Sequence, residues 1–385
     1  MIAVIADDFT GAAELAGLGL RYGLRVEIDS NGIENSDAEL LIIATDTRSM
    51  TSEKAYNEVK RITEELIKSN VLWIYKKTDS VLRGHVLTEL KAMLEATNKD
   101  KVLLVPSNPA YGRLIKNGTY YINNTPVHLT GFADDPEYSL LTSNVLEILG
   151  DINGLQAYLV TKKNDAIVNG VAIAEVSSIN DLDYWAEKVN QDIIPAGASG
   201  FFSSLLKVKG FNQVHTANQK IKFGKKFLFI CGSAFSQGRI AVEEAKMKGA
   251  KVCEMPDDVF YDRPPKEKHF KEWVKDTINA FKSNSKVIVE INQPVVKKPD
   301  FARRLRIEIA KLVEEVIDKV EVDELFIDGG ATVYAISKQL NMSKFLPCQE
   351  IAPGVIRMKV DNRPNFHLTI KPGSYLWPDE IWKFD

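Results

Sequence analysis

Two adjacent aspartates, Asp7 and Asp8, follow the first apolar run of the chain and precede Thr10 and a small-residue helix start. A short apolar run followed by a helical pattern predicts a buried strand, and open parallel sheets bind ligands at the carboxyl ends of their strands. A carboxylate at such a position can bind or deprotonate a substrate hydroxyl group. Alternatively, one aspartate caps the helix and the other is solvated. The residues alone leave both alternatives open.

A second polar segment begins at Lys77, directly after another predicted strand. Lys77 and Arg83 can neutralise a substrate carboxylate, and a guanidinium group does so with two parallel donors. Asp79 and Ser80 can bind hydroxyl groups. A third predicted strand end adds Arg48. A solvated turn of mixed charge is the alternative for each segment, but three polar strand ends favour a site for a molecule that carries a carboxylate and hydroxyl groups.

Two glycine-containing turns in the second half, at 231–233 and 328–332, each lie between a predicted strand and a predicted helix. Both suit phosphate binding, because glycine lets backbone N–H groups approach an anion at a helix N-terminus. Neither has the Walker or the dinucleotide-binding pattern, and such turns often serve backbone geometry alone. Turns at Gly354 and Gly373 give a weaker indication of the same kind.

The elements that must position these residues alternate between short apolar runs and stretches of helical period. In the first half, predicted strands at 2–6, 40–44, 71–75 and 102–105 alternate with predicted helices at 52–68 and 84–96. The second half has predicted strands at 227–231, 251–254, 286–291 and 324–327 and predicted helices at 236–248, 301–320 and 332–340. This alternation predicts parallel sheets that are covered by helices.

Residues 106–138 interrupt the alternation with many prolines and glycines and contain one predicted strand, 119–122, so this segment is predicted to be a functional loop. A cluster of glycine, asparagine, glutamine and lysine near 210–226 favours a linker. The fold prediction is therefore α/β with two domains, 1–215 and 216–385. Each is expected to hold a mostly parallel sheet flanked by helices, with the active site in the inter-domain cleft.

The composition excludes several other classes of protein. The 385 residues include 49 lysines and arginines against 52 aspartates and glutamates, and the basic residues form no arm or stripe, so no nucleic-acid partner is expected. The three cysteines lack zinc-site spacing and are expected to be reduced, and the five histidines define no metal site. No apolar run is long enough to span a bilayer, and no signal-peptide pattern is present. We expect a cytoplasmic protein without a membrane partner.

Taken together, the polar segments resemble the four-carbon acid sugar kinase family, which joins an N-terminal sugar-acid-binding domain to a C-terminal nucleotide-binding domain. The resemblance spans nearly the whole chain. Its most specific segments, in chain order, are residues 6–12, 46–49, 77–84, 109–113, 135–136 and 196–200.

This resemblance implies that ATP phosphorylates a hydroxyl group of threonate, erythronate or a 3-oxo-tetronate, with Mg²⁺ as the companion of ATP. Phosphoryl transfer needs positioning, charge neutralisation and a carboxylate that orients the attacking hydroxyl, and Asp79 or Asp8 is expected to be that base. Asp79 is favoured, with Asp7 and Asp8 binding hydroxyl groups, although the sequence does not separate these roles. The implied substrate-binding residues are Asp7, Asp8, Thr10, Arg48, Lys77, Asp79, Ser80 and Arg83. The implied nucleotide-binding residues are Ser233, Gly329, Gly330, Thr332, Gly354 and Gly373.

The second half departs from the family pattern in three places, the first of which is the glycine-serine turn, which runs on divergently through residues 234–238. Ala331 stands where an acidic residue is usual before the threonine, and the glycine-rich turn with a lysine reads Lys371 to Leu376 here. These departures keep open an alternative function, a sugar-acid-binding regulatory protein or a pseudokinase with an impaired nucleotide site. Self-association as a homodimer also stays open.

Overall fold

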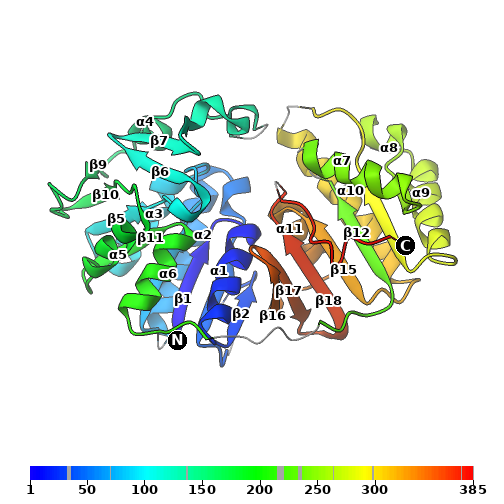
Figure 1. Ribbon diagram of the computed structural model, residues 1–385, viewed down its shortest axis with the longest axis horizontal. Coiled ribbons are helices and arrows are strands. Elements are labelled where there is room, and N and C mark those ends of the chain that lie inside the picture. The colour runs from blue at the N-terminus through cyan, green and yellow to red at the C-terminus, as the bar shows by residue number, and fades with distance from the viewer. Residues whose placement is uncertain are drawn as a thin grey trace. The chain divides into compact units, whose positions relative to one another are not determined.

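The computed structural model describes residues 1–32, 36–69, 71–135, 138–214, 221–232, 236–262, 264–296, 299–373 and 375–384. The chain divides into two compact units, Met1–His215 and Thr216–Asp385 (Figure 1). Each unit contains a sheet with helices on its faces, which confirms the predicted α/β class.

The sheet of the first unit has the strand order β2-β3-β1-β4-β11-β5-β10-β9, and the neighbouring strands run parallel. These strands are β1 (Ile2–Ala6), β2 (Val26–Asp29), β3 (Leu40–Ala44), β4 (Trp73–Lys77), β5 (Lys101–Val105), β9 (Ala157–Val160), β10 (Gly170–Ala174) and β11 (Ile193–Gly197). Strands β1 and β3 are apolar and buried throughout because helices cover both faces of a parallel sheet.

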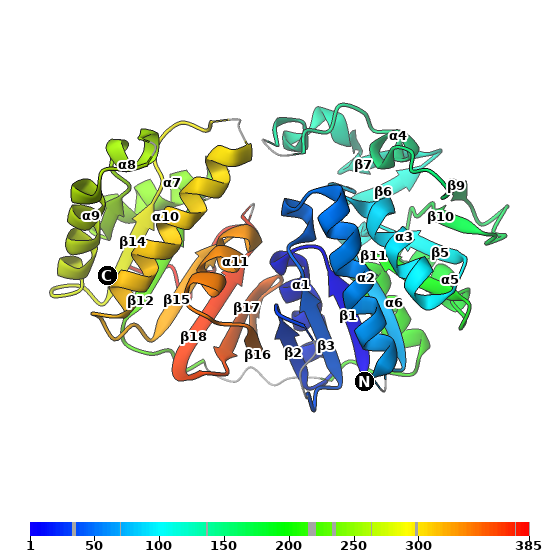
Figure 2. The same cartoon turned by 180° about the vertical axis from the view of Figure 1, so that it is seen from behind.

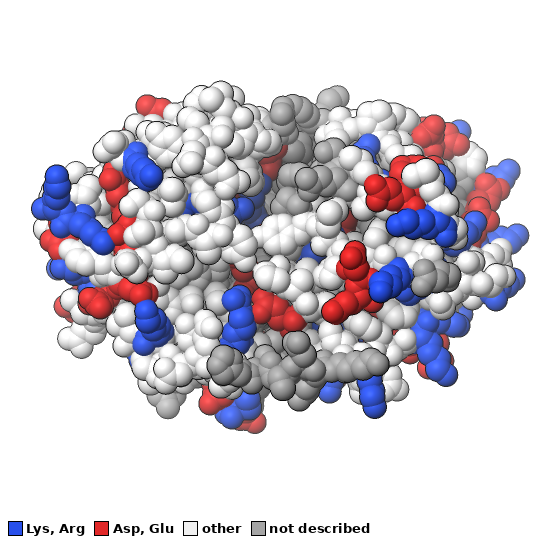
Figure 3. All heavy atoms as spheres, in the orientation of Figure 1, with Lys and Arg blue, Asp and Glu red and all other residues white. Residues whose placement is uncertain are grey.

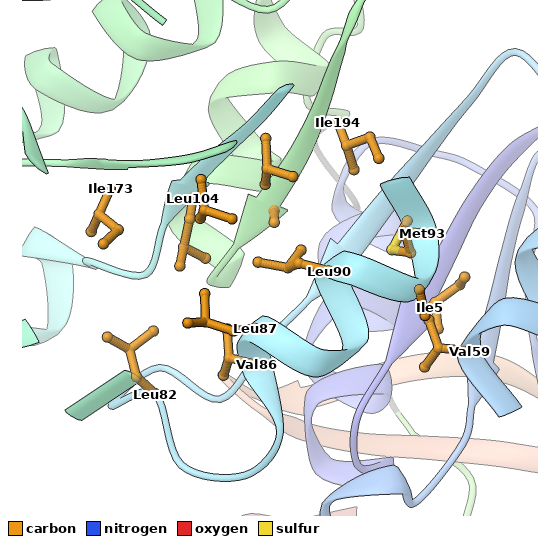
Figure 4. Close-up of a cluster of buried hydrophobic side chains, with 14 of the residues drawn as sticks. Ile5, Val59, Leu82, Val86, Leu87, Leu90, Met93, Leu104, Ile173 and Ile194 are labelled. Carbon is orange, nitrogen blue, oxygen red and sulfur yellow. The ribbon is translucent and has the colours of Figure 1, made fainter. Parts of the chain in front are cut away.

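Four helices of the first unit form two pairs on opposite faces of its sheet (Figures 1 and 2). One pair is α1 (Phe9–Arg21) and α6 (Ser199–Val208), with α5 (Ile179–Glu187) beside α6. The other pair is α2 (Ser52–Lys68) and α3 (Val86–Thr97). Figure 4 shows the core under α2 and α3, where Val59, Leu90 and Met93 meet side chains of the strands such as Ile5 and Leu104.

One buried ion pair interrupts the apolar interior of the first unit. Lys76 of β4 and Glu89 of α3 are almost fully buried, and Lys76 Nζ lies 2.7 Å from Glu89 Oε2. Lys76 Nζ also donates to the backbone carbonyl of Lys77 at 2.9 Å. The ammonium group therefore sits directly beneath the carboxyl end of β4, where the polar segment begins.

The segment between β5 and β9 contains more structure than the sequence indicated. The predicted strand 119–122 is present as β7 (Thr119–Ile122), and it pairs with β6 (Arg113–Lys116) and β8 (Thr125–Pro126) in a small antiparallel sheet. Helix α4 (Val145–Leu149) follows. The prediction of a single strand was wrong because the turn between β6 and β7 was not recognised: Asn117 and Gly118 both have positive φ, as a tight hairpin requires.

The sheet of the second unit has the order β13-β14-β12-β15-β18-β17-β16. Its strands are β12 (Phe227–Cys231), β13 (Lys251–Glu254), β14 (Lys286–Glu290), β15 (Glu324–Asp328), β16 (Lys344–Ala352), β17 (Val355–Val360) and β18 (Arg363–Lys371). The first five in this order run parallel, and β17 is antiparallel to both β18 and β16. The antiparallel end of the sheet was not predicted.

The helices of the second unit are α7 (Ser236–Met247), α8 (Asp257–Tyr261), α9 (Glu267–Ala280), α10 (Pro299–Ile317) and α11 (Gly330–Gln339). Helices α10 and α11 pack on each other over one face of the sheet (Figure 2). The sequence analysis missed α9. On the opposite face, beneath α7, lies an aromatic cluster in which the rings of Phe229 and Phe326 stack with centroids 4.5 Å apart.

None of the helices among the described residues is long and apolar enough to cross a membrane. On the face of the molecule drawn in Figure 3, basic and acidic side chains are interspersed. Cys231 and Cys253 are buried, and none of the three cysteines forms a disulfide within the described parts of the chain.

Candidate functional site

The carboxyl ends of β3, β1 and β4 are neighbours in the first sheet. The strand register pairs Ala6 of β1 with Ala44 of β3 and with Lys77 of β4. Because the strands are parallel, the polar segments that follow them leave the sheet side by side. The structure thus brings together the three strand ends that the sequence analysis singled out.

Arg48 connects two of these segments. One Nη atom of its guanidinium group pairs with Oδ2 of Asp8, and the other lies 2.8 Å from Oδ1 of Asp79. Asp8 also caps helix α1, because its Oδ1 accepts a hydrogen bond from Gly11 N at 2.7 Å. The capping alternative is therefore confirmed for Asp8, and its second oxygen is still used in the ion pair.

Asp79 is buried and accepts several hydrogen bonds. Arg83 donates to it through Nε at 3.0 Å and Nη2 at 2.7 Å, and the backbone N of Val81 donates at 3.1 Å. Burial alone would raise the pKa of Asp79. The charge and hydrogen bonds of Arg83 and the charge of Arg48 outweigh burial and hold this pKa well below its ordinary value. Asp79 is therefore ionised and a weak proton acceptor.

The chain turns tightly between Asp79 and α3. Leu82 and Gly84 adopt positive φ angles of 66° and 92°. A Cβ atom at position 84 would lie 3.1 Å from Cγ of Arg48. Glycine is required here because the backbone is left-handed and also passes close to the arginine that joins the segments.

The small antiparallel sheet supports Ser80. Nη1 of Arg113, at the start of β6, donates to Ser80 Oγ, and the hydroxyl group of Tyr120 in β7 donates to the Ser80 carbonyl at 2.5 Å. Neither Arg113 nor Tyr120 was among the predicted site residues, although Arg113 lies in the segment 109–113 that resembles the family. The Asn117-Gly118 turn was the available signal that these two residues share a hairpin.

The segment after the small sheet also contacts both arginines of the site. Nη1 of Arg83 lies 2.6 Å from Oδ2 of Asp135, and the Arg83 guanidinium stands over the ring of Phe132 at 5.1 Å. The hydroxyl group of Tyr138 donates to the backbone carbonyl of Arg48. The predicted functional loop therefore lies against the candidate site.

Lys77 is buried rather than open to solvent. Its Nζ donates to the backbone carbonyl of Thr78 at 2.9 Å and lies 3.6 Å from Oε2 of Glu14 in α1. Ser199, at the start of α6, donates to Oε1 of Glu14 at 2.5 Å. Glu14 was not among the predicted residues, because nothing in its local sequence distinguishes it from a surface glutamate of an amphipathic helix.

Asp7 and Thr10 complete the predicted set at this edge. Asp7 is only 3% exposed, and its Oδ1 has no hydrogen-bond partner among the described residues. Thr10 lies in the first turn of α1 and is half-buried. Buried polar atoms without partners are uncommon in folded proteins, and each needs an explanation such as a ligand. The Asp7 carboxylate is therefore a candidate acceptor for a substrate hydroxyl group.

Several of the predicted nucleotide residues converge in the second unit. Gly329 has a φ of 85°, and its N–H donates to the carbonyl of Lys371 at 3.0 Å. Helix α11 begins at the next residue, Gly330, and Thr332 is buried in its first turn. Ser233, which was predicted to bind the nucleotide from the turn at 231–233, lies outside the described residues.

The turn between β16 and β17 lies close to the end of β18. A Cβ atom at Gly354 would lie 3.6 Å from Cδ of Pro372, which precedes Gly373. Beside them, Lys371 and Asp328 form a buried ion pair of 2.8 Å. Burial raises the pKa of Asp328, although Lys371 opposes the shift. Because each charge is already balanced by the other, neither side chain is a ready partner for a phosphate or a metal ion.

Two families of known proteins match this chain, one within each of the two compact units. Residues 2–205 match a family described as the sugar-binding N-terminal domain, and residues 228–375 match the nucleotide-binding C-terminal domain. A 3-oxo-tetronate kinase of Brucella melitensis is 24% identical over 97% of this chain and 92% of its own length. A D-threonate kinase of Salmonella typhimurium is 23% identical over 94% and 92%. A D-erythronate kinase of Heliobacterium modesticaldum is 28% identical over 38% of this chain and 35% of its own.

Solved structures share the fold. A crystal structure of a Haemophilus influenzae protein superposes with a TM-score of 0.70 at 20% identity and covers 97% of both chains. One from Salmonella typhimurium gives 0.78 at 15% identity and covers 99% of this chain and 97% of the other. The family match covers more than half of the residues. The chain therefore belongs to the family that is defined by the sugar-binding N-terminal domain, followed here by the nucleotide-binding C-terminal domain.

Proposed function

We propose that this protein is a kinase that transfers the γ-phosphoryl group of ATP to a hydroxyl group of a four-carbon sugar acid. The observation that carries the proposal is the cluster in which Arg48 joins Asp8 to Asp79 beside Arg83, at the carboxyl ends of adjacent strands in the sugar-binding domain. Relatives that match over nearly the whole chain are named 3-oxo-tetronate kinase and D-threonate kinase, which supports this substrate class.

In this proposal the arginines bind the carboxylate of the sugar acid. A guanidinium group has five N–H donors, so Arg48 and Arg83 retain donors beyond those that contact Asp79. The Asp7 carboxylate accepts hydrogen bonds from hydroxyl groups of the acid, and the Ser80 hydroxyl donates to them, with Thr10 alongside. Lys77 adds positive charge under the site.

We assign the role of base to Asp8 rather than to Asp79. The low pKa of Asp79 makes it a poor acceptor for the proton of a hydroxyl group, so its role is to hold the two arginines in place. Phosphoryl transfer depends mainly on positioning and charge, so Asp8 needs only to orient and accept from the attacking hydroxyl.

Gly330 and the first turn of α11 are proposed to bind the phosphates of ATP, because the first backbone N–H groups of a helix lack intrahelical acceptors and suit an anion. The N–H of Gly329 already donates to the Lys371 carbonyl, so Gly329 contributes a close approach of the backbone rather than a donor. The described residues there offer Mg²⁺ little, since the Asp328 carboxylate is paired with Lys371. A Mg²⁺ ion would therefore be held chiefly by phosphate oxygens and would supply charge neutralisation. The alternative of a regulatory protein without kinase activity is less well supported, since the relatives that match nearly full length are named kinases.

The first test is ADP release from ATP and Mg²⁺ with D-threonate, D-erythronate and 3-oxo-tetronates as acceptors. At least one acid should be phosphorylated, and an absence of turnover with all of them would overturn the proposed function.

The second test is Asp8→Asn, which keeps a good helix cap because asparagine caps as well as aspartate. We expect a kcat lowered by about 100-fold or more, the usual contribution of a general base. The thermal midpoint should fall as well, because the partly buried ion pair with Arg48 is lost while the helix cap is kept. Asp183→Asn, which removes a surface carboxylate paired with Lys207, is the matched control and should leave kcat unchanged. An Asp8→Asn variant with full activity would refute the role of Asp8.

A further inference from the structure

Three glutamates of the second unit bring their carboxylates together at the carboxyl ends of β13 and β14, beside the strand β12 that leads into the turn 231–233. Glu243 comes from α7, Glu254 ends β13 and Glu290 ends β14. Each offers an oxygen atom, and these atoms lie within 4.8 Å of one another. The strand register places Glu254 directly beside Glu290. Three elements therefore direct negative charge at one point.

Glu290 is the unusual member of this group. Only 1% of its surface is exposed, and neither carboxylate oxygen has a hydrogen-bond partner among the described residues. Buried carboxylates nearly always have hydrogen-bond or ion-pair partners, because burial of an uncompensated charge is costly. Burial and the neighbouring Glu243 and Glu254 raise the pKa of Glu290 to about 7. The oxygens of Glu290 thus lack a positive partner.

The basic side chains nearby do not supply that partner. Arg239 directs its Nη atoms to the backbone carbonyls of Asn292, at 3.2 Å, and Gln293, at 2.7 Å. Lys246 pairs with Glu254 at the exposed side of the group. Both lower the pKa of Glu290 only through space. Arg239 and Lys246 thus lie near the three carboxylates, but neither of them forms a hydrogen bond with the buried carboxylate of Glu290.

The neighbouring strand adds no further charge. Cys231, at the end of β12, is paired with Glu290 in the strand register. Its thiol is buried and does not belong to the group of ligand atoms that lie within 4.8 Å of one another. The donors that face this point are therefore carboxylate oxygens, which hard divalent cations prefer.

We propose that Glu243, Glu254 and Glu290 form a binding site for a hard divalent cation, of the class of Mg²⁺, Mn²⁺ and Ca²⁺, in the nucleotide-binding domain. Glu290 supplies the buried ligand, and the exposed Glu243 and Glu254 close the site from the solvent side, where water completes the coordination. The site needs no nucleotide, because all three ligands belong to the protein. Binding of the cation can therefore be measured without ATP or sugar acid, so the outcome is distinguishable from a failure of the proposed kinase activity.

The test uses the full chain without nucleotide, titrated with Mn²⁺ and followed by electron paramagnetic resonance of the free ion. The parent protein should bind Mn²⁺, and Ca²⁺ or Mg²⁺ should displace it. Glu290→Gln keeps the size of the side chain and removes its charge, so we expect affinity to fall at least tenfold. Glu272→Gln, in the exposed part of α9, removes a surface carboxylate of the same unit and should not alter affinity.

Two results would overturn the proposal. One is a parent protein that binds no Mn²⁺ at millimolar concentration, which would mean that Glu290 is balanced by a proton alone. The other is a Glu290→Gln variant that binds as tightly as the parent. If Glu290→Gln does not fold, Glu243→Gln at the exposed ligand provides the same comparison, and unchanged affinity in that variant would likewise refute the site.

Discussion

Arg48 joins two carboxylates from different segments, and replacing it with lysine tests whether that bridge organises the site. Lysine keeps the positive charge but has one ammonium group, so it can contact Asp8 or Asp79 and not both in the present geometry. Asp79 retains Arg83, so the loss falls mainly on the connection between the first and second polar segments. Arg48→Lys therefore removes the bridge without removing the charge.

The magnitude follows from burial. The side chains of Arg48, Asp8 and Asp79 are 16%, 14% and 7% exposed. Removing one partner of a buried, hydrogen-bonded charge pair costs about 2–5 kcal/mol, and lysine restores one of the two contacts. We expect the free energy of unfolding to fall by about 1–3 kcal/mol. An equal loss in the free energy of sugar-acid binding corresponds to a weakening of about 5-fold to 150-fold.

The chain provides a matched control. Arg61 in α2 also joins two carboxylates, Glu58 at 2.7 Å and Glu65 at 2.7 Å, but its side chain is 42% exposed. Exposed pairs of this kind contribute about 0–1 kcal/mol, so Arg61→Lys should have little effect. Urea unfolding monitored by tryptophan fluorescence gives the stability of each variant, and isothermal titration with the sugar acid gives binding. Equal effects of Arg48→Lys and Arg61→Lys on both quantities would refute the reasoning.

Two further predictions concern buried charge in the first unit. Lys76→Met alone should lower the free energy of unfolding by about 3–5 kcal/mol, because Glu89 is left buried without its partner. The double variant Lys76→Met with Glu89→Leu should have a free energy of unfolding within about 1 kcal/mol of the parent, or above it. Urea unfolding checks this, and a double variant as unstable as the single one would contradict it. The pKa of Asp79 is far lower in the folded state than in the unfolded state. Its contribution to the free energy of unfolding is therefore complete above about pH 4 and is lost progressively as the pH falls further. The difference in unfolding free energy between the parent and Asp79→Asn should accordingly shrink on going from about pH 6 to about pH 3, and a constant difference would count against the assignment.

The sequence was sufficient to predict features that depend on local pattern. The apolar runs identified β1 and β3, and the helical period identified α2 with the bounds that the structure shows. Parallel strands then place their carboxyl ends together, so the meeting of Asp8 with Arg48 and Asp79 followed from topology.

The features that were missed depend on contacts between distant residues. Lys76 and Glu89 each resemble a solvated charge in the sequence, and only the packing of β4 against α3 shows that both are buried. The same holds for Glu290, whose surroundings come from α7 and β13. The pairing of β16, β17 and β18 was missed for another reason, since polar residues interrupt the apolar pattern of these strands.

The two oxygens of Asp8 serve different purposes, since Oδ1 caps α1 and Oδ2 pairs with Arg48. An asparagine at this position would satisfy the helix but would carry no charge. The helix cap by itself therefore does not protect the aspartate; its charge is retained for the ion pair with Arg48 and for turnover. In a duplicated gene freed from its metabolic task, we expect this position to drift to residues that still cap α1, such as asparagine. Retention of the acid across relatives would thus be a record of the site that it forms with Arg48 rather than of the helix that it caps.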